Sequence, residues 1–284
     1  MSKILLALVC ACCLSRVQLA SAHEFWLQPS NFRPAAGQEI SVDVSVSDVF
    51  YPGIHALLTD EDIVKFVAHG PGGQTPVTAK VGNGPIGKSS VGKITLPTPG
   101  LYILEFIDLT RFSQLEALTF ERYLEEKGLD NAIAVRKQQG ESDKPGREAW
   151  SHFLKTIVVA GDPGREIRDH ALGLKLEVIC DSRLDARRRD DTLSFKILYQ
   201  GAPLKGALVT ASRRTAPKDK LSMRTDANGH VEFKLSPDEW MIDTVHMIAA
   251  PNDLRATAIT GGGPQAARWR SFWASLTFEL SPRQ

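Results

Sequence analysis

Short runs in which apolar and polar residues alternate limit most strongly how this chain can fold. Residues 39–47 read Glu-Ile-Ser-Val-Asp-Val-Ser-Val-Ser, so every second residue is Ile or Val and lies on one face of a strand. Similar short runs follow at residues 63–68, 91–96 and 101–107. Gly and Pro separate these runs, which indicates turns as connections. The pattern predicts a β-sandwich.

A helical pattern interrupts the strands over residues 113–139. Its apolar residues recur at roughly helical spacing among charged ones, from Leu115 through Leu124 to Val135. Gly128 marks a break between two helices. A strand-like run resumes at residues 148–160, so we expect a small helical insertion near the end of the first sandwich domain.

A second set of strands follows the turn at residues 161–164. The candidate strands are residues 192–199, 207–212, 231–235, 240–249 and 271–280. Asn228-Gly229 is the pair that tight hairpins favour. This order of strands and turns resembles the prealbumin-like or carboxypeptidase-regulatory-like sandwich. The sequence thus predicts a mainly β protein with two immunoglobulin-like or prealbumin-like sandwich domains, residues 23–162 and 163–284.

The first 22 residues have the pattern of a cleavable signal peptide. Lys3 precedes an apolar run that ends near Leu14, and Ala20-Ser-Ala22 is the pattern that signal peptidase recognises. The run is too short for a permanent membrane anchor. We therefore expect export to the periplasm and a mature chain that begins at His23.

Charge and cysteine content narrow the range of partners and scaffolds. Removal of Lys3 and Arg16 changes the formal charge from +1 to −1, so no global basic field attracts nucleic acid. The cysteines at positions 10, 12 and 13 leave with the signal peptide, so Cys180 alone remains and a disulfide-stapled scaffold is excluded. Cys180 ends the strand-like run at residues 174–180, where a small apolar core residue is the favoured interpretation.

Motifs of common enzyme classes do not occur in the sequence. It contains no Gly-x-Ser-x-Gly elbow, phosphate-binding loop, dinucleotide fingerprint or His-Glu-x-x-His helix. The glycine-rich segment at residues 261–264 lacks a following Lys-Ser or Lys-Thr and indicates a loop. We expect a protein that is not an enzyme.

The mature amino terminus is the strongest candidate for metal chemistry. His23 would carry an α-amine with a pKa of about 7.7 to 8.0 and an imidazole with a pKa of about 6.5, and both lose protons near neutrality. Amine and imidazole nitrogens suit Cu(II), Ni(II) and Zn(II), and the general affinity order favours copper. His246 is the candidate for a further ligand, because a strand around Thr244 and Met247 would hold its imidazole at a fixed angle. The alternative for His246 is a hydrogen bond within the core.

Several ordered motifs resemble one protein family over nearly the whole mature chain. They are the opening His23-Glu-Phe-Trp-Leu-Gln-Pro29, Tyr123-Leu-x-x-x-Gly-Leu129, Gly140-Glu through Gly146-Arg-Glu148, Val245-His-Met247 and Trp273-Ala-Ser-Leu-Thr-Phe278. Together they resemble the domain-of-unknown-function 4198 family of exported bacterial proteins, some of which are named as nickel-uptake substrate-specific components. The resemblance implies a metal role for His23 and places His246 at the family's Val-His-Met position.

The remaining histidines have no motif that points to a metal. His55, His69, His152 and His170 are interpreted as solvated loop residues. His230 falls in the Asp-Ala-Asn-Gly turn and is interpreted as incidental. Glu24 neighbours His23, but adjacent residues in a strand point to opposite faces, so it is a weak candidate for a carboxylate ligand.

The leading hypothesis is a periplasmic metal-binding protein in which His23 and His246 hold a transition metal. Nickel or cobalt follows from the resemblance, and copper from affinity. The protein would deliver or buffer the ion for a membrane metal-uptake system, since nothing in the sequence resembles a permease segment.

Two other hypotheses remain open. In the first, the protein is a metal-free binding or adhesion module for a protein or carbohydrate, with Trp269 and Trp273 near Arg268 and Arg270 as an exposed aromatic surface. In the second, it is a copper enzyme of the histidine-brace kind, which also begins at a mature histidine. The larger motifs of those enzymes are absent, and this disfavours the second hypothesis.

Overall fold

The computed structural model describes residues 23–56, 58–80, 91–164, 167–184, 192–259 and 261–281. The predicted signal peptide lies outside the described residues. The elements in chain order are β1 (Glu24–Pro29), β2 (Glu39–Ser47), β3 (Ile54–His55), a 3-10 turn (Asp60–Asp62), β4 (Ile63–Gly70), β5 (Gly73–Pro76), β6 (Thr78–Lys80), β7 (Val91–Thr95), β8 (Gly100–Asp108), β9 (Arg111–Leu115), α1 (Ala117–Glu126), α2 (Asp130–Gln138), β10 (Gly146–Ala160), β11 (Leu176–Cys180), β12 (Thr192–Tyr199), β13 (Ala202–Pro203), β14 (Leu208–Arg213), β15 (Ala216–Arg224), β16 (His230–Lys234), β17 (Asp238–Ala249), β18 (Arg255–Ala256), β19 (Gln265–Ala266) and β20 (Trp269–Leu280). The prediction of a mainly β fold is confirmed.

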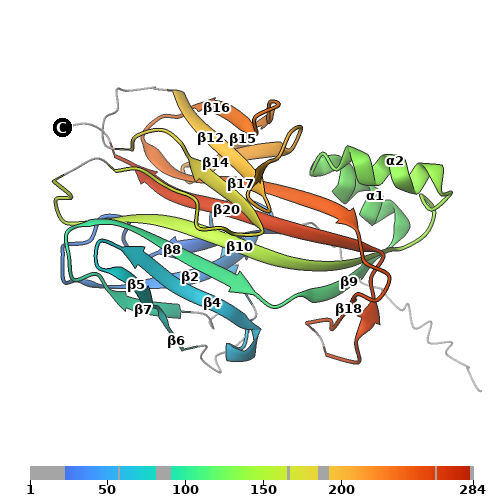
Figure 1. Ribbon diagram of the computed structural model, residues 1–284, viewed down its shortest axis with the longest axis horizontal. Coiled ribbons are helices and arrows are strands. Elements are labelled where there is room, and N and C mark those ends of the chain that lie inside the picture. Colours follow the sequence, from blue (N-terminus) through green and yellow to red (C-terminus); the bar gives the residue numbers. More distant parts are fainter. Residues whose placement is uncertain are drawn as a thin grey trace, which may run out of the picture.

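One large sheet runs through the molecule and takes strands from both halves of the chain. Its order is β15-β14-β17-β20-β10-β8-β4-β5, and β9 also pairs with β10. The long strands β17, β20 and β10 lie side by side across the centre (Figure 1). β10 and β20 are parallel, whereas β17 and β8 run antiparallel to their neighbours. Hydrogen bonds therefore join the two halves, and the domain boundary between residues 162 and 163 stays a prediction.

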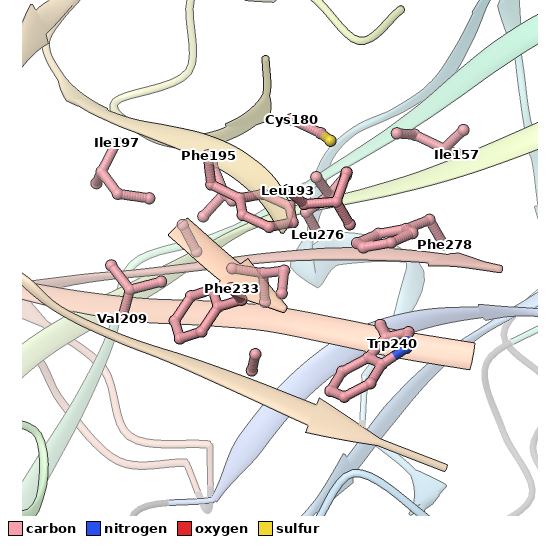
Figure 2. Close-up of a cluster of buried hydrophobic side chains, with 14 of the residues drawn as sticks. Ile157, Cys180, Leu193, Phe195, Ile197, Val209, Phe233, Trp240, Leu276 and Phe278 are labelled. Atoms are coloured by element: carbon pink, nitrogen blue, oxygen red, sulfur yellow. The ribbon is translucent and has the colours of Figure 1, made fainter. Parts of the chain in front are cut away.

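A smaller sheet covers one face of the central sheet. It consists of β11, β12, β13 and β16, with β12 pairing to the other three. The core between the two sheets contains Phe195, Phe233 and Phe278, all at most 2% exposed (Figure 2). The Cys180 thiol is buried in this core, which confirms its interpretation as a small apolar core residue.

A third sheet covers the opposite face of the central sheet. It contains β1, β2, β3, β7 and β6. The predicted alternation in residues 39–47 is confirmed, since Ile40, Val42 and Val44 are at most 2% exposed. They pack against buried residues of β8 and β10 such as Leu104 and Leu154. The smaller sheet and the third sheet thus cover opposite faces of the central sheet, which gives the sandwich arrangement.

The two helices lie at one end of the central sheet (Figure 1). They pack against Val245 and Trp273, on the face that the third sheet also covers. The predicted helical insertion is confirmed, but it begins at Ala117 and not at Ser113, because residues 113–115 belong to β9. Gly128 sits between the helices with a φ of +62° that a side chain would strain. Phe120 of α1 is fully buried. A Cβ added at Gly146 would lie 2.0 Å from the Phe120 ring, so this glycine permits the close approach of helix and sheet. None of the described helices is long and apolar enough to cross a membrane.

Strand β15 is the largest element that the sequence pattern did not predict. Its residues, Ala216–Arg224, are mostly exposed because β15 is the edge strand of the central sheet. An edge strand without a buried face carries no apolar alternation, so periodicity cannot reveal it.

Candidate functional site

A pocket opens where the start of β1 meets β9, α1, β10 and β20. Its volume is about 230 Å³. Its walls are formed by His23, Phe25, Ser113, Leu115, Tyr123, Glu148, Trp150, His152, Ile259 and Trp273. Most of these side chains are aromatic, and they come from segments that are far apart in the sequence.

Strand geometry explains how these residues reach one place. Successive side chains of a strand point to opposite faces, so Glu148, Trp150 and His152 of β10 share one face. The parallel register places His152 opposite Trp273 of β20. Phe25 lies two residues after His23 and therefore points to the same side of β1. The pocket thus lies over the face of the central sheet that the helices and the third sheet partly cover.

Aromatic rings pack against one another around the pocket. The Phe25 ring stacks on the His152 ring with centroids 3.8 Å apart, and Tyr123 stacks on Trp273 at 5.6 Å with an interplanar angle of 8°. Trp150 is tilted against His152 at 5.0 Å. Stacked and tilted ring pairs fix each other's orientation, so this wall is largely preformed.

Two imidazoles of the pocket are each held by a carboxylate. His23 Nδ1 lies 2.6 Å from Asp48 Oδ1, and about half of the His23 side chain is exposed. His152 Nδ1 lies 2.6 Å from Asp108 Oδ2, and the His152 backbone N–H donates to Asp108 Oδ1 at 2.6 Å. His152 is 2% exposed. A carboxylate on Nδ1 fixes the tautomer that leaves Nε2 as an acceptor. Nε2 of His152 makes no hydrogen bond with the described residues.

Glu148 is an acid buried in the wall of the pocket. The Tyr123 O–H donates to Glu148 Oε1 at 2.8 Å, and the Ser271 O–H donates to the same oxygen. Burial raises the pKa of Glu148 from 4.5 to about 7, although both hydrogen bonds lower it. Near neutral pH this carboxyl therefore exists in both protonation states.

Glu24 connects the start of β1 to a buried group of charges. Lys127 Nζ, at the end of α1, lies 2.6 Å from Glu24 Oε1, and Lys220 Nζ of β15 lies 3.2 Å from the same oxygen. Burial and the negative charge of Glu24 raise the pKa of Asp243 from 3.8 to about 8. Glu24 thus points away from the pocket into an ion cluster, as expected for the neighbour of His23 in a strand.

The expected pairing of His23 with His246 is not formed. Val245 and Met247 of β17 pack against the helices, so His246 between them points to the opposite face. There its ring lies 4.4 Å from Tyr199, and burial lowers its pKa. The central sheet separates His246 from the pocket that His23 lines.

Two further expectations differ from the structure. His69 and His152 are not solvated loop residues, because they lie on β4 and β10 and pair with the buried acids Glu105 and Asp108. The proposed exposed aromatic surface is also absent, because Trp269 is 1% exposed. Trp273 instead lines the pocket. Alternation of Glu148, Trp150 and His152 in a predicted strand was the sequence signal that could have indicated this site.

The donor set of the pocket fits a metal ion only in part. The described residues contain no group of three or more His, Cys, Asp and Glu side chains arranged to hold a metal. The pocket does bring together two imidazoles, and a carboxylate on Nδ1 orients that of His152 as in many metal-binding histidines. A processed amino terminus at His23 would add a nitrogen that is not a side-chain donor.

The fold and the pocket together define a mainly β protein with a preformed aromatic cavity beside a helical insertion. The chain belongs to the family described as a domain of unknown function, DUF4198, whose family model matches residues 20–248. The resemblance to this family is therefore confirmed.

The chain is distantly similar to two solved β structures. The D0-D1 domain of intimin is 12% identical, with 89% of this chain and 97% of that chain covered and a TM-score of 0.21. The fibronectin(III)-like modules of Clostridium thermocellum CbhA are also 12% identical, with 91% and 98% covered and a TM-score of 0.20. Scores this low carry no argument about function. A search of the curated proteins found no match.

Proposed function

We propose that this chain is an exported, periplasmic metal-binding protein that captures a transition-metal ion at the aromatic pocket through His23 and His152. One observation supports this most: two histidines from distant segments line one pocket, and Nδ1 of His152 lies 2.6 Å from Asp108 Oδ2, which leaves Nε2 of His152 as the nitrogen for a metal. A carboxylate in this position orients an imidazole for metal binding.

The nitrogen donors would come from both residues. After cleavage behind Ala22, the α-amine and Nδ1 of His23 can chelate one ion, and Nε2 of His152 can add a third nitrogen. Nδ1 of His23 would then leave Asp48, whose negative charge stays close to the ion. Imidazole and amine donors suit nickel, cobalt and copper. Family resemblance favours nickel or cobalt as the bound ion, whereas the general order of metal affinities favours copper.

The aromatic wall would control access to the ion. Phe25 stacks directly on His152, so the second imidazole is shielded from solvent on one side. A hydrophobic shell around a metal limits water access and lowers the local dielectric constant. The protein would pass the ion to a membrane uptake system, in keeping with the predicted export and with a binding role instead of a catalytic one.

Metal stoichiometry on correctly processed protein tests this proposal. The protein is exported through its own signal, checked by mass spectrometry for a His23 terminus, and titrated with Ni(II), Co(II) and Cu(II) by calorimetry. We expect one equivalent to bind. Affinity should fall steeply below about pH 6, because the amine and imidazole must lose protons before they bind metal.

Two variants make the test specific. One extra residue before His23 removes the chelating amine and should weaken binding by orders of magnitude. His152→Ala should weaken it as well, whereas His246→Ala is the matched control for a histidine on the other face. A processed protein that binds no metal, or equal affinities in all four proteins, would contradict the proposal.

A second candidate function is the capture of a small organic ligand, such as a sugar, without metal. The aromatic lining supports it, since Trp150 and Trp273 both face the pocket. In the presence of a chelator, a sugar titration that quenches tryptophan fluorescence and is lost in Trp273→Ala would favour this candidate.

A further inference from the structure

A second group of buried charges lies between β10 and the segment that leads into β11. The side chains of Lys155, Asp169 and Glu177 are each at most 1% exposed. Lys155 Nζ lies 3.0 Å and 3.2 Å from the two carboxylate oxygens of Asp169, and 3.2 Å from Glu177 Oε1. Because Nζ contacts both oxygens of Asp169, it faces the carbon that joins them.

We propose that the folded chain joins Lys155 Nζ to Asp169 Cγ by an intramolecular amide bond, with Glu177 as the base. The site lies beside the apolar core between the central and the smaller sheet, where Ile157 and Val178 are at most 3% exposed. An apolar surrounding disfavours separated charges and so favours conversion of an ammonium and a carboxyl to a neutral amide.

Asp169 is suited to be the electrophile. Burial raises its pKa above the ordinary value of 3.8, in spite of the opposing effect of Lys155. A carboxylic acid, unlike a carboxylate, can lose its hydroxyl as water. The backbone N–H groups of His170 and Cys180 donate to Oδ1 at 2.8 Å and to Oδ2 at 2.9 Å. Whichever oxygen leaves as water, the oxygen that remains keeps one of these donors, which would stabilise the oxyanion of a tetrahedral intermediate.

Glu177 is placed to accept a proton from the lysine. Three backbone N–H groups hold its carboxylate, those of Leu172, Gly173 and Leu174, at 2.7 to 3.1 Å. Its Oε1 also contacts Nζ. The base is thus fixed by a loop and needs no movement to reach the attacking nitrogen.

The reaction balances without a further reactant. Glu177 takes one proton from the Lys155 ammonium, and the neutral amine attacks Cγ of protonated Asp169. A second Nζ proton leaves with the Asp169 hydroxyl as water, and the third stays on the amide nitrogen. The products are one amide, one water molecule and a protonated Glu177, which returns its proton to solvent.

The bond would fix the connection between the two halves of the chain. Lys155 and Asp169 are 14 residues apart and flank the turn at residues 161–164. A covalent bridge there attaches β10 of the central sheet to the segment that enters the smaller sheet. Such a bridge restricts the unfolded chain and protects the connecting segment from proteases.

Intact mass under denaturing conditions is the test. Processed wild-type protein should be lighter than its sequence by one water molecule, and Glu177→Gln should have the full mass. Tryptic mapping should recover one branched peptide that contains residues 155 and 169, because trypsin does not cleave at an acylated lysine. Mapping needs only wild-type protein, so it decides the question even if Glu177→Gln does not fold.

Lys127→Gln is the matched control, since Lys127 is also a buried lysine beside a glutamate. It should keep the mass deficit, whereas Lys155→Met should lose it. A purely ionic cluster, in which Nζ remains bonded to the His170 and Val178 carbonyls, predicts the full mass in every protein. Full mass in wild-type protein after prolonged incubation in the folded state would overturn the proposal.

Discussion

In the part of the chain that the structure describes, Lys155 and Lys127 are the two buried lysines, and they have different sets of partners. Lys155 lies between Asp169 and Glu177, and backbone N–H groups bind both acids. Every carboxylate oxygen in that group accepts at least one hydrogen bond. Lys127 pairs with Glu24, but the neighbouring Asp243 has one oxygen, Oδ2, with no hydrogen bond to the described residues.

The difference between the two groups indicates different tasks. A group whose carboxylate oxygens are all hydrogen-bonded is rigid, which suits a structural bridge or the bond that we propose. The Lys127 group contains an acid whose pKa is raised to about 8, so its charge changes with pH. It also holds Glu24, the residue next to His23. The first group thus stabilises the junction of the halves, and the second connects the amino terminus to the helices.

The largest effect is expected for Lys155→Met. Removal of the lysine leaves Asp169 and Glu177 buried without a cation, which costs about 3–5 kcal/mol when one partner of a buried pair is lost. Urea denaturation should show this as a lower midpoint. A smaller loss of unfolding free energy than in Lys127→Met would contradict the view that the Lys155 group contributes more to stability than the Lys127 group.

Lys127→Met should lower the free energy of unfolding less, by about 1–3 kcal/mol, which is the usual penalty for a buried acceptor that loses its donor. The acceptor here is Glu24. Lys220 remains 3.2 Å from Glu24 and keeps part of the compensation. The same urea experiment measures it. In the double variant with Lys220→Met the loss should exceed that of either single variant, and equal losses would show that Lys220 contributes nothing.

Asp243 should make the protein less stable as the pH rises. Its pKa is 3.8 ordinarily and about 8 in the fold, so the folded chain binds more protons than the unfolded chain between these values. The free energy of unfolding should therefore fall, on the order of 1 kcal/mol per pH unit between about pH 5 and about pH 7. Glu148, with a pKa of about 7, acts in the same direction.

Asp243→Asn tests this pH dependence because it keeps the shape and removes the titrating group. Melting temperatures recorded across this pH range should depend less on pH in the variant than in the wild type. An unchanged slope would assign the dependence to Glu148 or to another group.

Asp108→Asn should weaken metal binding about 10- to 100-fold, as removal of a carboxylate behind a metal-binding histidine usually does. The amide oxygen that this substitution introduces can still accept the backbone N–H of His152, so the strand should keep its position. Calorimetric titration of the processed protein measures the change. An unchanged affinity would remove His152 from the proposed ligand set.

Segments with one buried face could be predicted from the sequence, whereas the residues that form the pocket could not. The run at residues 39–47 shows its inner face by alternation, and the helical insertion shows 3.6-residue periodicity. The pocket combines His23 at the start of β1, Tyr123 of α1 and Trp273 of β20, and the parallel pairing of β10 and β20 places Trp273 beside His152. No local pattern encodes such a long-range pairing.

The buried charged group around Lys155 could not be predicted from the sequence either. Lys155 follows Phe153 and Leu154 in a mostly apolar run, and nothing near it in the sequence indicates Asp169 or Glu177 as partners. For His246 the strand was predicted correctly, but the sequence could not show that its side chain lies on the face of the sheet opposite the pocket. Alternation gives two faces but does not say which one carries the pocket.

The smallest effect is expected for His246→Ala, and it decides between the two possible second ligands. The central sheet lies between this side chain and the pocket, so metal affinity at His23 should not change. The loss of its packing against Tyr199 should cost a little stability, about 1 kcal/mol, because the ring is only partly buried. A large loss of metal affinity together with an intact melting temperature would instead support the pair His23 and His246. It would also mean that the start of β1 reaches the other face of the sheet in the metal-bound protein.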